Sequence, residues 1–473
     1  MLDFSIIAQD PGTREIVQQG LLERAFHDAL FPQLLYRSEF TDQDFGGNLG
    51  DSRIFSAPGL IKPKTRPLQP TVDPLPSTFG FEQWETQLQQ YGDSIDTYMP
   101  SNYAAIASIL LRNAQQLGMS AGQAMNLLSR DTAFNAAMSG TTVTDGSATI
   151  TTTGTIRVAR LNGFTTARNS GLADASQTRY APVSSMNPLM IKLVDSTGAK
   201  VSAKVVAYNA DNAGDVYGSG TLTLDAIPGG AHTFNNRAAV LANDRTDSVQ
   251  VGGGDSIDSL TANSIVNPSD IRSVVAKMRT MKVPTMADGT YHCHIDAIGE
   301  AQVFSNPEVQ RMLTALPDYY MYQEFAIGKY LGTSFIRNTE SPTPETVEGG
   351  ASASYSMDEQ FGGEVYTGGT TDGTPVHRAL FFGGGGLVEY YTDLGALITE
   401  AGITGKVGKF QITNNGITVL TDRVQLIVRA PLNRLQDQIA TTWKFIGSWV
   451  ARTDGAAGLP PRYKRQMQLL YGA

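Results

Sequence analysis

Three neighbouring residues, His292, Cys293 and His294, have the side chains best suited to metal binding or thiol chemistry. They lie in the run TYHCHIDAI, whose composition predicts a strand. Because successive side chains of a strand point to opposite faces, the two histidines share a face and the cysteine points away. A metal needs at least one more ligand, and a catalytic Cys–His pair needs facing side chains. We therefore expect a structural strand, with no metal and no cofactor, because the other histidines stand singly: His27, His232 and His377.

A run of four glycines, Gly383–Gly386, has the composition of a phosphate-binding loop. Such a loop needs Lys and then Ser or Thr after its last glycine, whereas Leu387, Val388 and Glu389 follow here. We predict a tight bend between two strands. No nucleophile-elbow, zinc-protease or paired-carboxylate motif accompanies it, so the sequence predicts no catalytic residues and no enzyme.

The C-terminal segment is basic although the whole chain is acidic. The formal net charge of the chain is −9, and residues 405–473 carry +7 of charge, which leaves −16 for residues 1–404. Arg423 and Arg429 lie six positions apart on one predicted strand, and further cations gather near the end. Basic patches bind nucleic acid or complementary protein surfaces. We favour a solvated face or a contact face between subunits over a dedicated nucleic-acid site, because the nearby aromatic residues are spaced like core residues.

Composition limits the remaining classes of protein. The chain has 473 residues, 41% of them hydrophobic, so it is long enough for two or three domains with real cores. Only 17% of residues are charged and 48 are glycine, which predicts many turns or large surfaces that become covered. One cysteine excludes an internal disulfide framework. The N-terminus lacks a signal-peptide pattern and no apolar run approaches a membrane span, so we expect assembly in a cytoplasm.

Hydrophobic spacing predicts an α+β chain. Residues 13–31 form an amphipathic helix, and a Pro- and Gly-rich extended stretch with strands toward its end follows over 46–100. Residues 101–140 form the longest helix. Residues 141–254 are rich in Thr, Ser and Gly and form a small all-β module. The remainder mixes short helices and strands without strict alternation, with strands dominating after Lys406.

The order of these parts resembles a tailed-phage major capsid protein with the HK97-like fold. The stretch YGDSIDTYMPSNYAAIASILLRNAQQLGMSAGQAMNLLSRDTAFNAAMSG is similar to the end of an E-loop running into a spine helix. NPSDIRSVVAKMRTMKVPTMADGTYHCHIDAIGEAQVFSNPEVQRML and FAIGKYLGTSFIRNTES resemble A-domain elements. HRALFFGGGGLVEYYTDL and LQDQIATTWKFIGSWVAR resemble late strands of that fold.

The resemblance implies a division of the chain and a set of partners. It implies an N-terminal arm (1–45), an E-loop (46–100), a spine helix of the P-domain (101–142), an inserted β domain (143–254), an A-domain (255–404) and C-terminal P-domain strands (405–473). It also implies a structural coat protein that forms hexamers and pentamers in an icosahedral virion shell around double-stranded DNA. The head would assemble in the bacterial cytoplasm with a portal protein. Scaffolding and decoration proteins and non-specific DNA contact are compatible with it, and no membrane is involved.

Basic and aromatic side chains of the extended loop and the C-terminal strands are the predicted contacts between subunits. They are Arg53, Lys62, Lys64, Arg66, Trp84, Arg423, Arg429 and Lys444. Two other classes remain open at this point. A secreted β-rich adhesin would explain the Thr- and Gly-rich module but predicts a signal peptide, and a cytoplasmic hydrolase predicts a nucleophile–base set that the sequence lacks.

Overall fold

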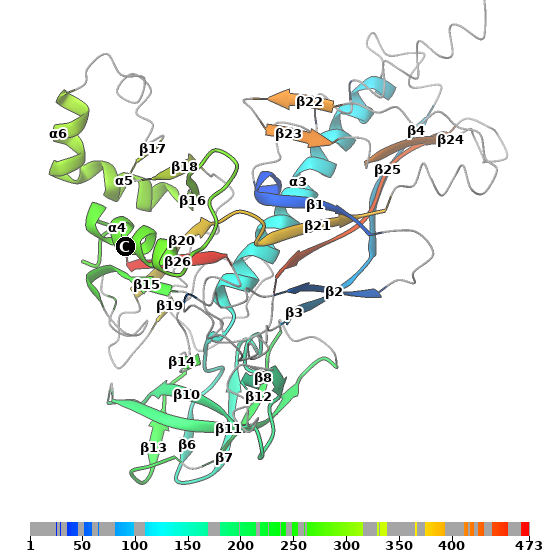
Figure 1. Ribbon diagram of the computed structural model, residues 1–473. Coiled ribbons are helices and arrows are strands. Elements are labelled where there is room, and N and C mark those ends of the chain that lie inside the picture. The colour runs from blue at the N-terminus through cyan, green and yellow to red at the C-terminus, as the bar shows by residue number, and fades with distance from the viewer. Residues whose placement is uncertain are drawn as a thin grey trace, which may run out of the picture. The chain divides into compact units, whose positions relative to one another are not determined.

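The chain divides into two compact units, and each is described by itself. Unit 1 comprises Met1–Arg53, Glu85–Arg130 and Leu387–Val450, and unit 2 comprises Ile54–Trp84, Asp131–Gly386 and Ala451–Ala473. The structure is a computed structural model (Figure 1). It describes residues 25, 29, 36–45, 52–58, 65, 81–98, 109–168, 180–197, 199–213, 218–225, 227–236, 238–242, 248–253, 260, 263–315, 329–330, 332–337, 365–366, 374–392, 411–414, 417–420, 424–429, 438–452 and 465–472.

Unit 1 contains a five-stranded sheet in the order β1-β21-β25-β24, with β4 also paired to β25. β1 runs parallel to β21, whereas β4 and β24 both run antiparallel to β25. A 3-10 turn, η3 (Tyr36–Glu39), leads directly into β1. The strands are β1 (Phe40–Asp44), β4 (Gln89–Tyr98), β21 (Leu387–Tyr391), β24 (Gln425–Arg429) and β25 (Gln438–Ala451).

The long helix predicted over 101–140 is confirmed as α3 (Ile109–Met138). Its 30 residues correspond to a length of about 45 Å at 1.5 Å per residue. Within unit 1 its buried side chains are Ala114, Leu117, Ala121 and Met125, at spacings of three and four. The first part of the predicted helix, 101–108, lies outside the described residues.

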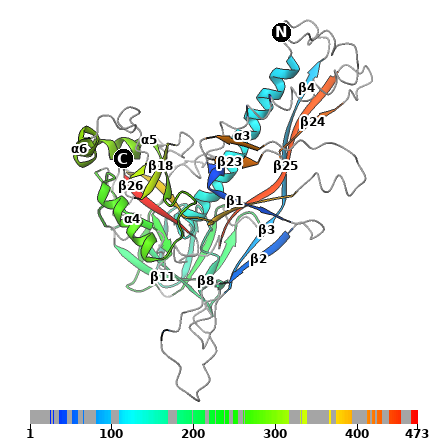
Figure 2. The same cartoon turned by 45° about the horizontal axis from the view of Figure 1, so that its top comes forward.

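The strands β2 and β3 follow β1 in the sequence and lie within residues 46–100, the stretch predicted to be extended. β2 (Ser52–Pro58) pairs with β3 (Phe81–Gln87) in a two-stranded sheet, and β4 begins two residues after β3 ends (Figure 2). The strands expected between Thr78 and Asp96 are therefore present. The helix predicted over 13–31 lies outside the described residues, apart from Ala25 and Ala29, which are helical.

Unit 2 contains a seven-stranded mixed sheet in the order β15-β26-β20-β16-β18-β17, with β19 paired to β20. Its helices supply apolar faces to one core: α4 buries Ile271, Val274, Val275 and Met278. The helices are α4 (Pro268–Thr280), α5 (Ala297–Ser305) and α6 (Pro307–Ala315). The strands are β15 (Ser248–Gln250), β16 (Tyr291–Ile295), β17 (Lys329–Tyr330), β18 (Thr333–Arg337), β19 (Val365–Tyr366), β20 (Thr374–Phe382) and β26 (Gln466–Gly472).

Local signals predicted most of this sheet and its helices. Asn267 caps α4 through a capping box with Asp270, as the sequence NPSD indicates. The strand predicted at His292–His294 is confirmed as part of β16, and α6 begins at Pro307. The sequence analysis did not predict α5 or β26 as separate elements, and the structure places β26, with all seven residues buried, between β15 and β20.

Composition predicted a β module over residues 141–254; the structure has such a module, but its last strand, β14, ends at Ala242, and β15 pairs instead with β26 in the seven-stranded sheet. Six strands make an antiparallel sheet in the order β5-β14-β10-β11-β12-β7, beside the two-stranded pairs β6–β13 and β8–β9. Inward positions alternate along the strands, as in β12 (Gly220–Asp225), where Leu222 and Leu224 are buried. The other strands are β5 (Thr141–Val143), β6 (Ala148–Ile150), β7 (Gly154–Val158), β8 (Thr166–Arg168), β9 (Tyr180–Pro182), β10 (Leu189–Val194), β11 (Lys200–Ala210), β13 (His232–Phe234) and β14 (Ala239–Ala242).

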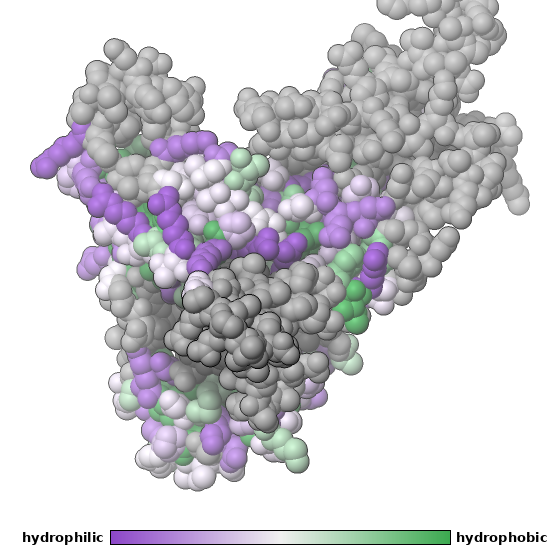
Figure 3. All heavy atoms as spheres, viewed as in Figure 1, coloured by the Kyte–Doolittle hydropathy of each residue, from purple (hydrophilic) through white to green (hydrophobic). Residues whose placement is uncertain are grey.

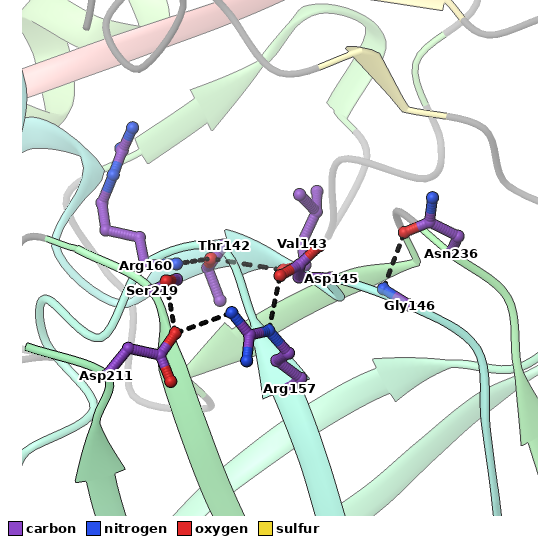
Figure 4. A network of polar contacts seen from close by, with 9 residues as sticks. All are labelled: Thr142, Val143, Asp145, Gly146, Arg157, Arg160, Asp211, Ser219 and Asn236. Carbon is purple, nitrogen blue, oxygen red and sulfur yellow. Dashed lines mark hydrogen bonds and ion pairs between the residues drawn. The ribbon is translucent and has the colours of Figure 1, made fainter. Parts of the chain in front are cut away.

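Polar networks brace the surface and turns of this module. Arg157 donates to Asp145 at 2.7 Å and to Asp211 at 2.8 Å, which ties β7 to two loops (Figure 4). In the β10–β11 turn, the Asp195 carboxylate accepts hydrogen bonds from the hydroxyl and the amide of Thr197 and from the amide of Ala199. These bonds, led by that of the Thr197 hydroxyl, lower the pKa of Asp195 to about 2.

A fourth two-stranded pair lies nearer the C-terminus, where β22 (Gln411–Asn414) runs antiparallel to β23 (Ile417–Leu420). This hairpin confirms the expectation of strands after Lys406. Among the described residues, none of the helices combines the length and the apolar character that crossing a membrane would require.

Candidate functional site

Two strands of the five-stranded sheet in unit 1, β4 and β25, form a long antiparallel pair, which we call the ribbon. The strands pair over ten positions, from Tyr98 opposite Gln438 to Gln89 opposite Gly447. Residues 441–450 of β25 alternate strictly between buried and half-buried, which gives the ribbon an inner face and an outer face. β4 is exposed at most of its positions, so much of the ribbon's surface is left uncovered by the described chain.

The inner face of the ribbon is aromatic. Phe445 and Trp449 stack at 5.2 Å between ring centroids, and Tyr91 of β4 lies 5.5 Å from Trp449. Trp443, two residues before Phe445 on the same face of β25, is buried as well. On this face Asn113 of α3 donates to the Thr97 hydroxyl at 2.7 Å. Of the four aromatic residues whose spacing predicted core positions, Trp443, Phe445 and Trp449 are buried, and Tyr463 lies outside the described residues.

A buried ion pair joins distant parts of unit 1. The Arg37 guanidinium meets the Glu389 carboxylate in a bidentate arrangement, with Nε–Oε2 at 2.6 Å and Nη2–Oε1 at 2.5 Å. Their side chains are 4% and 0% exposed. The guanidinium also lies 5.7 Å from the Phe445 ring and contacts the sulfur of Met125 in α3. This lock, Arg37–Glu389, connects η3, β21, β25 and α3.

Sequence reasoning missed this lock. The two residues are 352 positions apart, and each stands in an unremarkable local context. The only local signal is a glutamate inside the apolar strand sequence LVEYY, because a buried carboxylate needs a cationic partner. A second contact also binds η3 to α3, because the Tyr36 amide donates a hydrogen bond to Asn126 Oδ1 at 2.8 Å.

Three of the predicted contact residues have described side chains. Arg53 is half-buried and donates to the Phe45 carbonyl at 2.8 Å. Trp84 is 8% exposed and lies between Phe55, at 6.3 Å, and the guanidinium of Arg452, at 5.0 Å. Lys444 is half-buried on the outer face of the ribbon, opposite Gly92.

The other predicted contacts are not brought together by the described structure. Arg429 ends β24 opposite Ala440, and only its backbone is described. The remaining four lie outside the described residues: Lys62, Lys64, Arg66 and Arg423. The role of all eight residues in contacts between subunits stays a prediction.

The His292–His294 strand has the structural character that alternation predicted. Cys293 is fully buried in the core of unit 2, and this burial raises the pKa of its thiol well above the ordinary value. His294 is 1% exposed and packs edge-on against Phe382. Within the described ranges, no group of three or more His, Cys, Asp or Glu side chains could hold a metal ion.

The glycine run forms the predicted bend after β20. Backbone contacts hold it from both sides, with Gly383 N donating to Arg465 O at 2.8 Å and Gly384 N to Pro284 O at 3.0 Å. A Cβ on Gly384 would lie 2.6 Å from the Thr285 carbonyl oxygen, and Gly385 has a φ of 73°. Close backbone packing, rather than phosphate binding, therefore explains why glycine is needed here.

One polar cluster of unit 2 had no sequence signal. The Asp296 carboxylate accepts from His377 Nδ1 at 2.6 Å, from the Tyr471 hydroxyl and from the Gly299 amide at 2.8 Å. The His377 and Tyr471 rings stack at 5.5 Å. Burial opposes ionisation of Asp296, but the hydrogen bonds outweigh it and lower its pKa. Because all three side chains are buried, the cluster pins α5, β20 and β26 together and offers no access to a substrate.

Solved structures provide the comparison that decides the fold. The chain matches the Cyanophage Pam1 capsid asymmetric unit with a TM-score of 0.50 at 9% identity, over 94% of this chain and 92% of that chain. The chain has a phage capsid fold. The capsid of Ralstonia phage GP4 gives a TM-score of 0.49 at 12% identity, over 93% and 91% of the two chains. The capsid structure of the Cyanophage P-SCSP1u gives 0.45 at 8% identity, over 93% and 88%.

Sequence comparison finds no relative of the chain. No family model matches the chain, and no curated protein matches it in sequence. The expectation of an α+β capsid fold is confirmed at this level.

Proposed function

We propose that the chain is the major capsid protein of a tailed phage, a structural subunit that self-assembles into the icosahedral head around double-stranded DNA. One observation carries the proposal: the fold match to the Pam1 capsid extends over 94% of this chain and 92% of that chain. A match of such completeness supports a whole capsid subunit rather than a shared domain. It does not favour the adhesin, which needs no capsid fold.

In finer detail we propose the HK97-like arrangement. α3 is the spine helix, β2–β4 form the E-loop region, and the β module is a domain inserted between spine helix and A-domain. The exposed outer face of the ribbon, which includes the half-buried Lys444, supports this HK97-like assignment. A subunit with such a face becomes more stable when another subunit covers it. The charge difference between residues 1–404 and 405–473 supports complementary contacts between subunits.

The partners follow from the same proposal. Copies of the chain associate as hexamers and pentamers, a portal protein occupies one vertex, and scaffolding and decoration proteins bind during assembly or afterwards. The basic C-terminal segment tolerates packaged DNA without reading its sequence. The chain acts without catalysis and without a cofactor, in the virion, after assembly in the bacterial cytoplasm.

Electron microscopy of the expressed chain tests the proposal. We expect shells or capsomer-sized rings in negative stain, from the protein alone or with a scaffolding protein. A species that stays monomeric under every assembly condition would refute the function.

A deletion tests the role given to the extended loop. Removing residues 46–78 should abolish particles while the remaining protein stays soluble, because neighbouring subunits lose the loop that covers them. Removing residues 169–179 of the β module provides the control and should leave particles intact. Shells that form without residues 46–78 would contradict the role of the loop.

A further inference from the structure

The strand β4 has a long edge that no described strand of its own chain covers. Its ten residues exceed the common strand length of about five to six, and within the described chain β4 pairs only with β25. The residues Ala440–Lys444 of β25 pair with β4 on one side and with β24 on the other, which places β24 across β25 from the free edge. Most of β4 is exposed, so this edge is open to a partner.

The backbone groups that point toward the free edge follow from the hydrogen bonding of β25. Residues of an antiparallel pair alternate between bonding the partner strand and pointing away from it. The Thr392 amide, just after β21, donates to the Ile446 carbonyl, so the even-numbered residues of β25 bond away from β4. Their partners in β4 therefore point outward, and accordingly the Ser94 amide bonds the Asp93 side chain at 2.8 Å. The outward residues are Gln90, Gly92, Ser94, Asp96 and Tyr98.

The edge of β4 lacks most of the features that keep edge strands apart. Short length, proline, lysine and bulges discourage pairing with another chain. β4 contains neither proline nor lysine, its register with β25 has no bulge, and its only charges are Asp93 and Asp96. On the face seen in Figure 3, most described side chains are hydrophilic or neutral, and hydrophobic ones form only small areas. Backbone bonding at a sheet edge needs no large apolar surface, which suits this composition.

The edge of β4 is complementary to itself. Two copies related by a twofold axis run antiparallel, and with Ser94 opposite Ser94 of the second copy every outward residue meets another outward residue. Gly92 then meets Asp96, and Gln90 meets Tyr98. The five opposed pairs would exchange about ten backbone hydrogen bonds, and no carboxylate lies directly opposite another.

A cation of the neighbouring strand completes the match of charges. Lys444 of β25 lies opposite Gly92, is half-buried and makes no ion pair among the described residues. In the twofold register, Asp96 of the second copy lies opposite the same glycine from the other side. Lys444 and that Asp96 are then two strand spacings apart, about 10 Å between Cα atoms, with no side chain on Gly92 to separate them. The twofold axis repeats this ion pair.

We propose that β4 pairs with β4 of a second copy of this chain across a twofold axis, which joins two unit 1 sheets into one. The contact is isologous, because both subunits use the same surface. The inference rests on the proposed function, since an icosahedral shell contains twofold axes between copies of its subunit, and it names the partner of the free edge of β4.

Disulfide crosslinking of the full chain under assembly conditions tests the contact. Ser94→Cys places a thiol opposite its own copy, about 5.5 Å away between Cα atoms, which a disulfide can span. Gln90→Cys is the control, because Gln90 is an exposed outward residue too but lies eight positions, about 27 Å, from its own copy. The native Cys293 is buried and does not compete. We expect at least tenfold more disulfide-linked dimer from Ser94→Cys on non-reducing gels.

A charge exchange tests the predicted ion pair. In the Ser94→Cys background, Asp96→Lys should lower the dimer yield about fivefold, because the new lysine meets Lys444 of the second copy. Adding Lys444→Asp restores opposite charges and should return the yield to within about twofold of the starting level. Within one chain Asp96 lies opposite Ala440, four positions from Lys444, so the rescue reports on the contact between copies. Equal thermal midpoints of these variants would exclude a loss of fold.

The outcomes separate the contact from the shell. Particles of Ser94→Cys without dimer above the Gln90→Cys level would overturn the inference and leave the proposed function standing. Protection of the outward β4 amides from hydrogen exchange in wild-type monomers would show that the chain covers its own edge, and would overturn the second copy as the partner. Dimers with the expected charge dependence, in material that never forms particles, would support the contact and refute the shell.

Discussion

The buried lock between Arg37 and Glu389 allows a quantitative test of how unit 1 is held together. The Glu389→Gln variant keeps the shape of the side chain but leaves the Arg37 guanidinium without a counter-charge. Both side chains are almost completely inaccessible, at 4% and 0% exposure, so water cannot replace the lost partner. Breaking such a pair costs about 3–5 kcal/mol of unfolding free energy, and we expect about 3 because the amide still accepts one hydrogen bond.

The control removes both charges at once. Replacing Arg37 by Met and Glu389 by Leu substitutes apolar groups of similar volume for the pair, which for buried ion pairs is often neutral or stabilising. We expect this double variant to lie within about 1 kcal/mol of the wild type, because the desolvation penalty disappears together with the attraction. The Phe445 ring loses its cation contact, which is worth about 0.5–1 kcal/mol.

Urea unfolding followed by tryptophan fluorescence measures both variants. Of the three tryptophans, Trp443 and Trp449 lie on the inner face of the ribbon and report on unit 1. The unassembled chain is used, so that contacts between subunits do not add stability. A loss below about 1 kcal/mol for Glu389→Gln, or an equal loss for the single and double variants, would refute the reasoning.

Three further predictions concern unit 2. Because the pKa of Asp195 is lowered to about 2, its contribution to the free energy of unfolding is complete above about pH 4 and is lost as the pH falls toward 2. Calorimetry across this pH range should show that Asp195→Asn removes part of the acid-dependent loss of stability, and an unchanged pH dependence would contradict the role of the turn. In denaturant unfolding, Gly384→Ala should lower the free energy of unfolding by more than about 2 kcal/mol, because the added Cβ clashes with the Thr285 carbonyl oxygen. Gly289→Ala should lower it by about 1 kcal/mol, because the added Cβ meets open space but the φ of 77° is unfavourable for alanine. The thiol of Cys293 should react with an aromatic disulfide reagent only after unfolding, and complete labelling of the native chain within minutes would contradict its burial.

Local patterns in the sequence predicted the elements whose stability is decided by near neighbours. α4 begins at Pro268 because Asn267 and Asp270 cap it, and its buried side chains recur at three and four positions. Two other local properties are the alternation of buried and half-buried residues along β25 and the many prolines before Phe79, which disfavour a helix there. The order of such elements along the chain led to the resemblance to capsid proteins, which the fold match confirms.

Elements without a local pattern were missed. β26 has the sequence QMQLLYG, in which polar and apolar residues alternate only partly, yet every residue is buried. Gln466 is satisfied by the Ala133 carbonyl, a residue 333 positions away. A strand of this kind becomes recognisable only after its neighbours β15 and β20 are in place.

The sequence alone thus determined the types and the order of those elements that have a local pattern, and the low-charge, glycine-rich character of the chain. Tertiary structure decided which distant side chains meet: Arg37 with Glu389, and Asp296 with His377 and Tyr471. The physical reason is that periodicity, capping and turn chemistry act within a few residues, whereas buried polar groups acquire their partners only when the chain folds.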